Sequence, residues 1–264
     1  MKDMFLAVWR YRHFIVSSIR NDLRSRFARS KLGAVWMILQ PLAQVAIYSL
    51  VLSRIMSAKL PGIDNRYAYS LYLLSGMLAW SLFSEIVSRS ITVFVDNGGL
   101  LKKIVFPRVC LPITVVGSAL VNNLMLFLMT IVVFALLGHL PTLALLWVPA
   151  LMLSTIALGL GLGLLLGVLN VFVRDINQVM VVVLQLWFWL TPIVYMVSIV
   201  PPQLMYVMRL NPMYWIVTEY QALLVYGRAP DPMSLLPIGV SALVLLILGL
   251  LLFRRAATDM VDVL

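Results

Sequence analysis

The sequence lacks most of the groups with which enzymes do chemistry. Its 264 residues include one cysteine, Cys110, and two histidines, His13 and His139, that stand far apart. A single cysteine excludes an internal disulfide, and isolated histidines do not form a metal site. A Gly-x-x-x-x-Gly-Lys-Ser/Thr phosphate loop is also missing, which excludes ATP hydrolysis of that kind by this chain. We therefore expect a protein that is not an enzyme and binds no metal or cofactor of its own.

Charged side chains are missing from one very long stretch. Between Val109 and Val173 the chain runs 65 residues without Asp, Glu, Lys or Arg, and the mean hydropathy of the whole sequence is +1.02. No soluble domain can bury such a stretch, so it needs a bilayer as its solvent. The segment Gly138-His139-Leu140-Pro141 interrupts it near the middle. It therefore divides into two spanning helices, since each crossing needs about 20 apolar residues.

Other uncharged runs predict further spanning helices. Residues 176–208 carry no charge, but Pro192 and the Pro201-Pro202 pair limit the length of that helix. We therefore predict an all-α, polytopic membrane protein with a single transmembrane domain over residues 1–264. Its six expected spans lie at about residues 32–54, 67–92, 110–137, 143–172, 177–197 and 232–253.

Basic residues are distributed unevenly over this predicted topology. With both termini inside, fifteen Lys and Arg residues lie on the inner side and five on the outer side. Cytoplasmic loops of membrane proteins carry such an excess of positive charge. The asymmetry explains the net charge of +10 without a nucleic-acid partner, and we expect none. Both termini are predicted to be cytoplasmic.

Residues 4–30 have the pattern of a helix that lies on a membrane. At 100° per residue, the apolar side chains of residues 4–24 share one face and the basic and polar ones share the other, except that Arg12 lies on the apolar side, where a long side chain is tolerated. We predict an amphipathic interfacial helix along the inner leaflet. A basic cluster follows it, and this cluster either fixes the topology against anionic lipids or docks an anionic lipid-linked substrate or a partner subunit. Its members are Arg24, Arg26, Arg29 and Lys31.

Residues 200–227 are apolar although the topology places them outside the membrane. Asn211-Pro212 divides the segment, and Glu219 is a charge inside its apolar second half. We predict a pair of short helices that re-enter the outer leaflet, an arrangement tolerated only where protein or a water-filled cavity surrounds it. Such an element would form a gate on the exit side, with Asn211, Pro212 and Glu219 as its candidate residues.

Acidic side chains are almost missing from the predicted spans. Glu85 lies toward one end of the second span, with Arg89 four residues later as its expected ion-pair partner. Carriers driven by protons or sodium usually bind the coupling ion at an intramembrane ionisable group, so secondary transport is disfavoured. Helix packing is expected at Gly159, Gly163 and Gly167, and interhelical hydrogen bonding at Asn122-Asn123.

Several short segments resemble one family of membrane proteins. Residues 96–108 read DNGGLLKKIVFPR and are followed by Leu111-Pro112, and residues 26–36 read RFARSKLGAVW. Residues 39–42 (LQPL), Asn170 with Arg174-Asp175, residues 191–195 (TPIVY) and Asn211-Pro212 continue the likeness. Over essentially its whole length the chain resembles the permease of a type-two ABC exporter. Within that family it is most similar to the polysaccharide branch, which comprises O-antigen, teichoic acid and capsule permeases.

The resemblance implies partners as well as a fold. It implies a homodimer in the bacterial inner membrane, paired with two copies of a separate ATPase subunit that binds ATP and Mg. It also implies that residues 96–107 form a cytoplasmic coupling helix seated on the ATPase. The alternative is a solvated loop whose lysines only fix the topology. The residues expected at the ATPase are Asn97, Leu101, Lys102, Lys103, Phe106, Arg174 and Asp175.

A lipid-linked glycan is the implied cargo, and the fifth span offers groups for its path. Aromatic rings can stack on sugar rings, and glutamine amides can bind hydroxyls without holding a sugar in one register. The alternative is an aromatic belt at the outer interface with glutamines that pack between helices. The path residues we expect are Gln178, Gln185, Trp187, Trp189 and Tyr195, with Arg24, Arg26, Arg29 and Lys31 guiding the lipid pyrophosphate at entry.

Three other functions remain open at the level of sequence. The nearest is a drug or small-lipid exporter of the same architecture, which a neighbourhood of glycosyltransferase genes would disfavour. A lipid scramblase or channel would work without ATP. A membrane anchor for a glycan-assembling complex would tolerate point mutations on the pore face.

Overall fold

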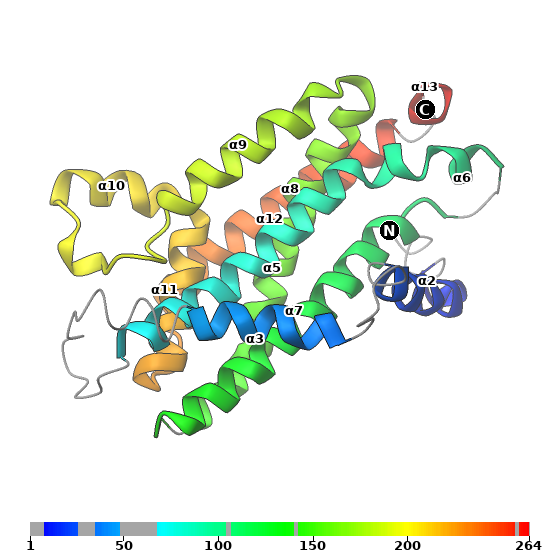
Figure 1. Ribbon diagram of the computed structural model, residues 1–264. Coiled ribbons are helices and arrows are strands. Elements are labelled where there is room, and N and C mark those ends of the chain that lie inside the picture. The colour runs from blue at the N-terminus through cyan, green and yellow to red at the C-terminus, as the bar shows by residue number, and fades with distance from the viewer. Residues whose placement is uncertain are drawn as a thin grey trace.

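Figure 1 shows a computed structural model of the chain, which describes residues 8–25, 35–47, 68–103, 107–139, 142–256 and 259–263. All regular secondary structure in these ranges is helical. The predicted all-α class is therefore confirmed.

Four helices in the described part of the chain are long and apolar enough to cross a membrane. They run side by side, with α5, α8 and α12 forming a layered core and α7 lying against α5 (Figure 1). Each coincides with a predicted span: α5 is Ala68–Asp96, α7 is Cys110–Leu136, α8 is Val148–Phe172 after the 3-10 turn η3 at Leu143–Trp147, and α12 is Pro232–Ala256.

The first and fifth predicted spans are described as shorter helices. Helix α3 is Trp36–Ile47, and the rest of that expected span lies outside the described residues. Helix α9 is Asp175–Trp189, 15 residues, and ends before the predicted limit at 197. It ends there because Pro192 disfavours helical backbone in the residue before it and cannot donate a helical hydrogen bond. Six spans therefore remain a prediction.

Helix α5 is the most enclosed of the long helices. It contacts α7, α8, α9 and α11, and Leu78, Phe83 and Ile86 on it are fully buried. Since lipid is as apolar as these side chains, their burial reflects close packing between helices more than escape from water. A displacement at either end of α5 therefore acts directly on the helices packed around it.

Glycines bring the backbones of α8 and α5 together, as their spacing predicted. A Cβ added at Gly167 would lie 2.4 Å from the carbonyl oxygen of Ser90, and one added at Gly163 would lie 2.6 Å from the Ser90 Cβ. Gly159 of α8 faces Ile86, which lies on α5 as Ser90 does. The expectation of close helix packing at these three glycines is confirmed.

A second glycine contact, which the sequence analysis did not single out, joins α8 to α12. A Cβ at Gly161 would lie 2.4 Å from the backbone nitrogen of Leu246, and one at Gly249 would lie 2.5 Å from the Gly161 carbonyl oxygen. Helix α8 is thus held between two helices through glycines on opposite faces.

Helix α2, Arg12–Ser25, crosses the first turns of α7 (Figure 1). Ile15 is buried there, and Ile19 lies over Gly117, where an added Cβ would be 2.2 Å from the Ile19 Cδ1. Trp9 and Val16 from the same predicted apolar face are exposed, at 71% and 64%. Part of the apolar face therefore packs on α7, and the rest faces the surroundings of the chain.

Two short helices occupy residues 200–227, as predicted. Helix α10 is Pro202–Leu210 and α11 is Pro212–Tyr226, which ends at Gly227 with a positive φ of 63°. Helix α11 packs against α5 and α12, so it is part of the core. Its depth in a membrane stays a prediction.

The two ends of the bundle carry different small elements (Figure 1). Helix α6, Gly98–Lys103, and helix α13, Asp259–Val263, lie at one end, which we call the α6 end. Helices α10 and α11 lie toward the other, which we call the α10 end. In the predicted topology the α6 end is cytoplasmic.

We expect Gly161→Leu to destabilise the protein, because a side chain there meets the α12 backbone, which cannot move aside as a flexible side chain would. Overpacking of this kind costs about 1–3 kcal/mol, which thermal unfolding in detergent would register as a lower Tm. Gly239→Leu on α12 is the matched control, since an added Cβ there meets nothing within 4 Å. Equal melting of both variants would contradict the packing described.

Candidate functional site

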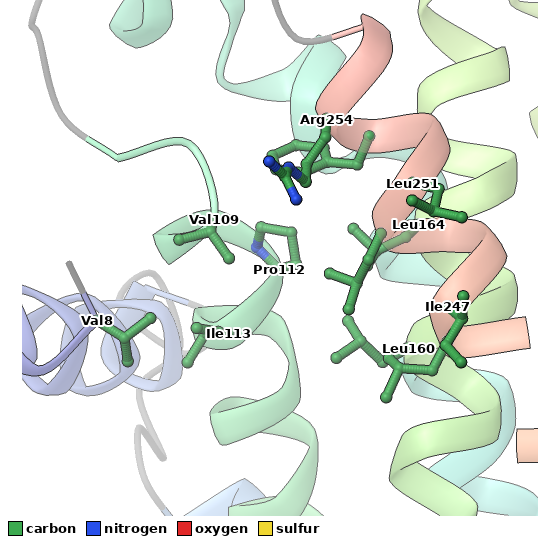
Figure 2. A pocket seen from close by; sticks show the side chains of 12 residues that line it. Val8, Val109, Pro112, Ile113, Leu160, Leu164, Ile247, Leu251 and Arg254 are labelled. Carbon is green, nitrogen blue, oxygen red and sulfur yellow. The ribbon is translucent and has the colours of Figure 1, made fainter. Parts of the chain in front are cut away.

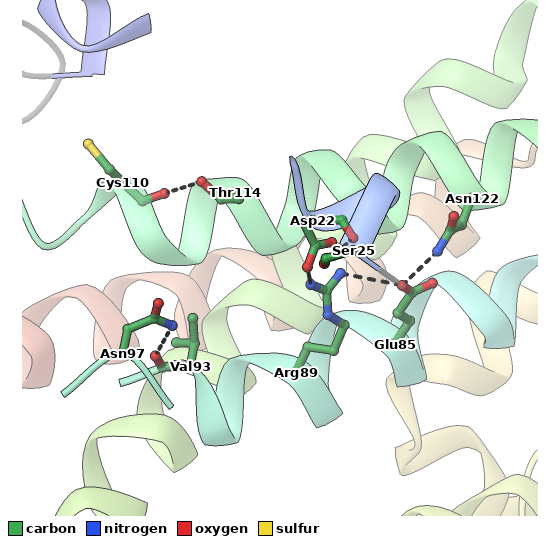
Figure 3. A network of polar contacts seen from close by, with 9 residues as sticks. All are labelled: Asp22, Ser25, Glu85, Arg89, Val93, Asn97, Cys110, Thr114 and Asn122. Atoms are coloured by element: carbon green, nitrogen blue, oxygen red, sulfur yellow. Dashed lines mark hydrogen bonds and ion pairs between the residues drawn. The ribbon is translucent and has the colours of Figure 1, made fainter. Parts of the chain in front are cut away.

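A network of charged and polar side chains joins α2, α5 and α7 (Figure 3). The Arg89 guanidinium on α5 lies 2.8 Å from the Asp22 carboxylate on α2 and 3.5 Å from the Glu85 carboxylate one turn earlier. The Asn122 amide on α7 donates to Glu85 at 2.9 Å. The ion pair expected between Glu85 and Arg89 is confirmed, and the structure adds Asp22 to it.

The surroundings of this network explain its composition. The side chains of Asp22, Glu85 and Arg89 are each only about a quarter exposed. Charges in such a position are costly unless they are paired, and one guanidinium here serves two carboxylates. The network therefore fixes α2 to α5 by charge as well as to α7 by apolar packing.

Asn123 forms a second polar link between the same two long helices. Its side chain is buried, and its Nδ2 donates to the Leu78 carbonyl at 2.9 Å and to the Ser81 hydroxyl at 3.1 Å. Because Asn122 also bonds across to α5, the prediction that this pair joins helices is confirmed.

Helix α6 begins where α5 ends, with a single residue between them. The Asn97 Nδ2 donates to the Val93 carbonyl at 2.8 Å, and its own carbonyl accepts the Leu101 amide at 3.0 Å. Leu101 is buried and Lys102 is exposed. The side chain of Lys103 and all of Phe106 lie outside the described residues. Of the expected coupling residues, Asn97 and Leu101 thus attach α6 to its own chain, while Lys102 faces outward.

An apolar cluster supports α6 from beneath. Leu101 belongs to a buried group with Phe94 from α5, Phe253 from α12 and Met260 from α13. The rings of Phe94 and Phe253 are stacked with their centroids 5.5 Å apart. Since these residues come from four helices, a force on α6 reaches the ends of α5 and α12.

The corner between α8 and α9 also lies at the α6 end. Arg174 and Asp175 are exposed at a tight turn, and α9 begins at Asp175. Behind them the buried Asn170 donates to the Ile91 carbonyl at 3.0 Å and accepts the Asn177 amide at 3.1 Å. This asparagine therefore ties the corner to α5.

The five residues expected to form a cargo path do not share one surface. Gln178, Gln185 and Trp189 are exposed on α9, and their spacing places them within about 40° of one another around the helix. Trp187 points the other way. Its indole nitrogen donates to Asn211 at 2.8 Å, and its ring packs edge-on against that of Phe83 with the ring centroids 5.2 Å apart.

Tyr195, the fifth, lies beyond the end of α9. Its hydroxyl donates to the Trp189 carbonyl at 2.9 Å. It therefore helps to shape the turn that follows α9 and stays close to the exposed face.

Asn211 ties the end of α9 to the start of α11. Its Oδ1 accepts from the Met213 amide at 2.9 Å, capping α11, and from the Trp187 indole. Its Nδ2 donates to the Thr191 hydroxyl at 3.0 Å. Pro212 occupies the first helical position, where its missing amide hydrogen is no loss. The Asn211-Pro212 pair is thus the joint between the two helices.

Glu219 lies on the inner side of α11, which is not among the four candidate spans. It is 8% exposed and accepts a hydrogen bond from the Ser234 hydroxyl at the start of α12. Burial raises the pKa of this carboxyl above its ordinary value, while the bond from Ser234 opposes that shift. Glu219 therefore links α11 to α12.

A cavity of about 300 Å³ opens beside α11. It combines two phenol rings with an amide, two aliphatic hydroxyls and a guanidinium, groups that can stack on and hydrogen-bond to a polar ligand. No pattern in the sequence pointed to these residues, because they come from three separate segments. The polar and aromatic members are Tyr72, Ser198, Thr218, Gln221, Tyr226 and Arg228.

The predicted entry cluster is only partly described. Arg24 is exposed in the last turn of α2, whereas Arg26, Arg29 and Lys31 lie outside the described residues. Within the ranges that the structure describes, no group of three His, Cys, Asp or Glu side chains could hold a metal ion.

Comparisons with known proteins give a consistent picture. A family model described as "ABC-2 type transporter" matches residues 13–225. An O-antigen export system permease protein of Myxococcus xanthus is 29% identical over 241 residues, which cover 90% of each chain. One from Klebsiella pneumoniae is 26% identical over 91% of each chain. A polysialic acid transport protein of Escherichia coli is 28% identical over 88% of this chain and 89% of its own.

The Asp22–Arg89 ion pair is expected to hold α2 in place. We predict that Asp22→Asn and Arg89→Gln each speed amide hydrogen exchange in residues 12–25, and that the double variant adds little to either, because both remove one interaction. A coupling energy of about 0.5–1 kcal/mol is expected for a partly exposed pair. Arg24→Gln, exposed on the same helix, is the control. Fully additive effects would show that the pair does not hold the helix.

Proposed function

The chain belongs to the ABC-2 type transporter family, and from this premise we propose that it is the permease of an ATP-driven polysaccharide exporter. The cargo we propose is a lipid-linked glycan, specifically O-antigen, moved from the cytoplasmic side across the bacterial inner membrane. The observation that carries the proposal is similarity over about nine-tenths of both chains to proteins named as O-antigen export permeases.

The chain itself is a transport subunit, and a separate ATPase subunit supplies the energy. We propose two copies of each, with ATP and Mg bound by the ATPase and with both termini of this chain in the cytoplasm. The α6 end is the surface we assign to the ATPase. The exposed Lys102, Arg174 and Asp175 are gathered there. The expected coupling set also includes Lys103 and Phe106, but the side chain of Lys103 and all of Phe106 lie outside the described residues.

Movement of the ATPase would reach the bundle through α6. Leu101 is buried against Phe94 and Phe253, so a push on α6 is transmitted to α5 and α12 instead of being lost in a flexible loop. Helix α5 also carries Arg89, which holds Asp22 on α2. A displacement of α5 would therefore shift the interfacial helix as well, and this shift could admit the lipid pyrophosphate near Arg24.

The exposed face of α9 is the surface that we assign to the glycan. Gln178, Gln185 and Trp189 lie along it, and a second copy of the chain would place an equivalent face opposite. Trp187 is assigned a structural role instead, because it binds Asn211. We assign the cavity lined by Tyr72, Gln221 and Arg228 to the exit side of the path. Asn211, Pro212 and Glu219 hold α11 against α9 and α12 on that side.

Deletion of the gene should trap full-length lipid-linked polymer on the cytoplasmic side and leave none at the cell surface. Immunodetection of the glycan in intact and in permeabilised cells would measure this. Unchanged surface glycan would contradict the proposal and favour an exporter of a drug or a small lipid. Polymer export that persists with a hydrolysis-deficient ATPase would favour a pore that works without ATP.

Reversal of the Lys102 charge should weaken attachment to the ATPase. We expect Lys102→Glu to lower surface glycan about tenfold at equal membrane abundance, because it replaces attraction by repulsion at an interface. Arg209→Glu on α10 is the matched control, since it makes the same change at an exposed position near the opposite end. Equal export by both variants would remove α6 from the ATPase interface.

A further inference from the structure

A second cavity lies near the α6 end, apart from the proposed cargo face (Figure 2). Its volume is about 400 Å³. Helices α7 and α12 form its two sides without packing extensively on each other, and Leu160 and Leu164 of α8 lie behind them. Val8 closes one edge just before α2. Its other lining residues are Val109, Pro112, Ile113, Leu246, Ile247, Leu250, Leu251, Phe253 and Arg254.

Arg254 is the one charged residue among these lining groups. Its side chain reaches from α12 toward Val109 at the start of α7 (Figure 2). Among the residues that the structure describes, no carboxylate pairs with it. The cavity therefore has an apolar body and, at the end that faces the α6 side, a guanidinium with no carboxylate partner in the described part of the chain.

We propose that this cavity holds an acyl chain of an anionic membrane phospholipid whose phosphate binds Arg254. A guanidinium matches a phosphate through two parallel hydrogen bonds, and one positive charge balances the single negative charge of a phosphodiester. A lipid pyrophosphate carries more charge than one arginine neutralises, so a resident phospholipid fits the site better than the cargo does.

The dimensions and position of the cavity suit such a chain. From Leu246 to Arg254 the α12 wall spans nine residues, and the eight helical rises between them give about 12 Å. The arginine lies in the last turn of α12, where the predicted topology places the inner headgroup region. The acyl chain would thus lie along the apolar wall of the cavity, and the headgroup would lie beside Arg254.

A bound lipid would also act on the coupling end. Phe253 lines the cavity and stacks on Phe94 in the cluster that supports Leu101 and α6. When a lipid fills the cavity, the side of Phe253 that faces it gains dispersion contacts. An empty cavity cannot provide them. The lipid would therefore stiffen the apolar cluster that supports α6. This inference rests on the position of α6 and not on the identity of the cargo.

Native mass spectrometry of the full chain would test the site. Phosphatidylglycerol and phosphatidylethanolamine with identical acyl chains are titrated separately. The wild type should bind phosphatidylglycerol more tightly, and Arg254→Gln should weaken that binding about fivefold, the usual effect of one basic residue near an anionic headgroup. Arg255→Gln, the exposed neighbour that does not line the cavity, should bind as the wild type does.

A second pair of variants tests the cavity itself. Ile247→Trp fills it, whereas Leu248→Trp adds the same bulk at a neighbouring residue of similar exposure that does not line it. Only Ile247→Trp should reduce lipid binding. In the wild type, phosphatidylglycerol should raise the Tm more than phosphatidylethanolamine does, and Arg254→Gln should abolish the difference.

Four outcomes would overturn the proposal. Equal binding of both lipids by the wild type would show that the site does not select an anionic lipid, and unchanged phosphatidylglycerol binding in Arg254→Gln would remove the role of Arg254. Loss of binding in Arg254→Gln but not in Ile247→Trp would indicate surface charge alone. Displacement of phosphatidylglycerol by equimolar polyprenyl pyrophosphate would assign the cavity to the cargo. Each outcome leaves the glycan export test unaffected, so the two proposals fail independently.

Discussion

The close approach of three helix backbones is the contact on which the rest of the structure depends. In lipid there is little hydrophobic gain from bringing two helices together, so association relies on van der Waals contact and on polar links. Glycines on α8 provide that contact on both sides, with Gly163 and Gly167 against Ser90 of α5 and Gly161 against α12. Once these three helices are fixed, α7 and α11 can pack on the exposed side of α5.

Polar side chains then attach the remaining elements at a few chosen points. Asn170 holds the start of α9, Asn211 holds its end, and Asn123 joins α7 to α5. Each is an amide whose donors and acceptors are shared between helices, which in an apolar medium gives directional contact without the cost of a buried charge. Helix α9 is thus secured mainly at its two ends, and it keeps an exposed face, which we assign above to the glycan.

Three structural connections meet at the α6 end. The cluster around Leu101 joins the expected ATPase contact to α5 and α12, the ion pair of Arg89 with Asp22 joins α5 to the interfacial helix, and Phe253 joins the cluster to the apolar cavity. A permease driven by a separate subunit needs such rigid links, because an input at its surface has to move helices within the membrane. A lipid in the cavity would set how firmly the input is held.

The sequence by itself determined the helical class, the four long spans, the division of residues 200–227 at Asn211 and the helix packing at Gly159, Gly163 and Gly167. These follow from local quantities, namely hydropathy over some 20 residues and a period of 3.6. Only the tertiary structure decided that Asp22 joins Arg89, that Trp187 turns inward, and that Tyr72, Gln221 and Arg228 surround one cavity. Such contacts depend on how each helix is rotated against its neighbours, and hydropathy in an apolar span is nearly the same on every face.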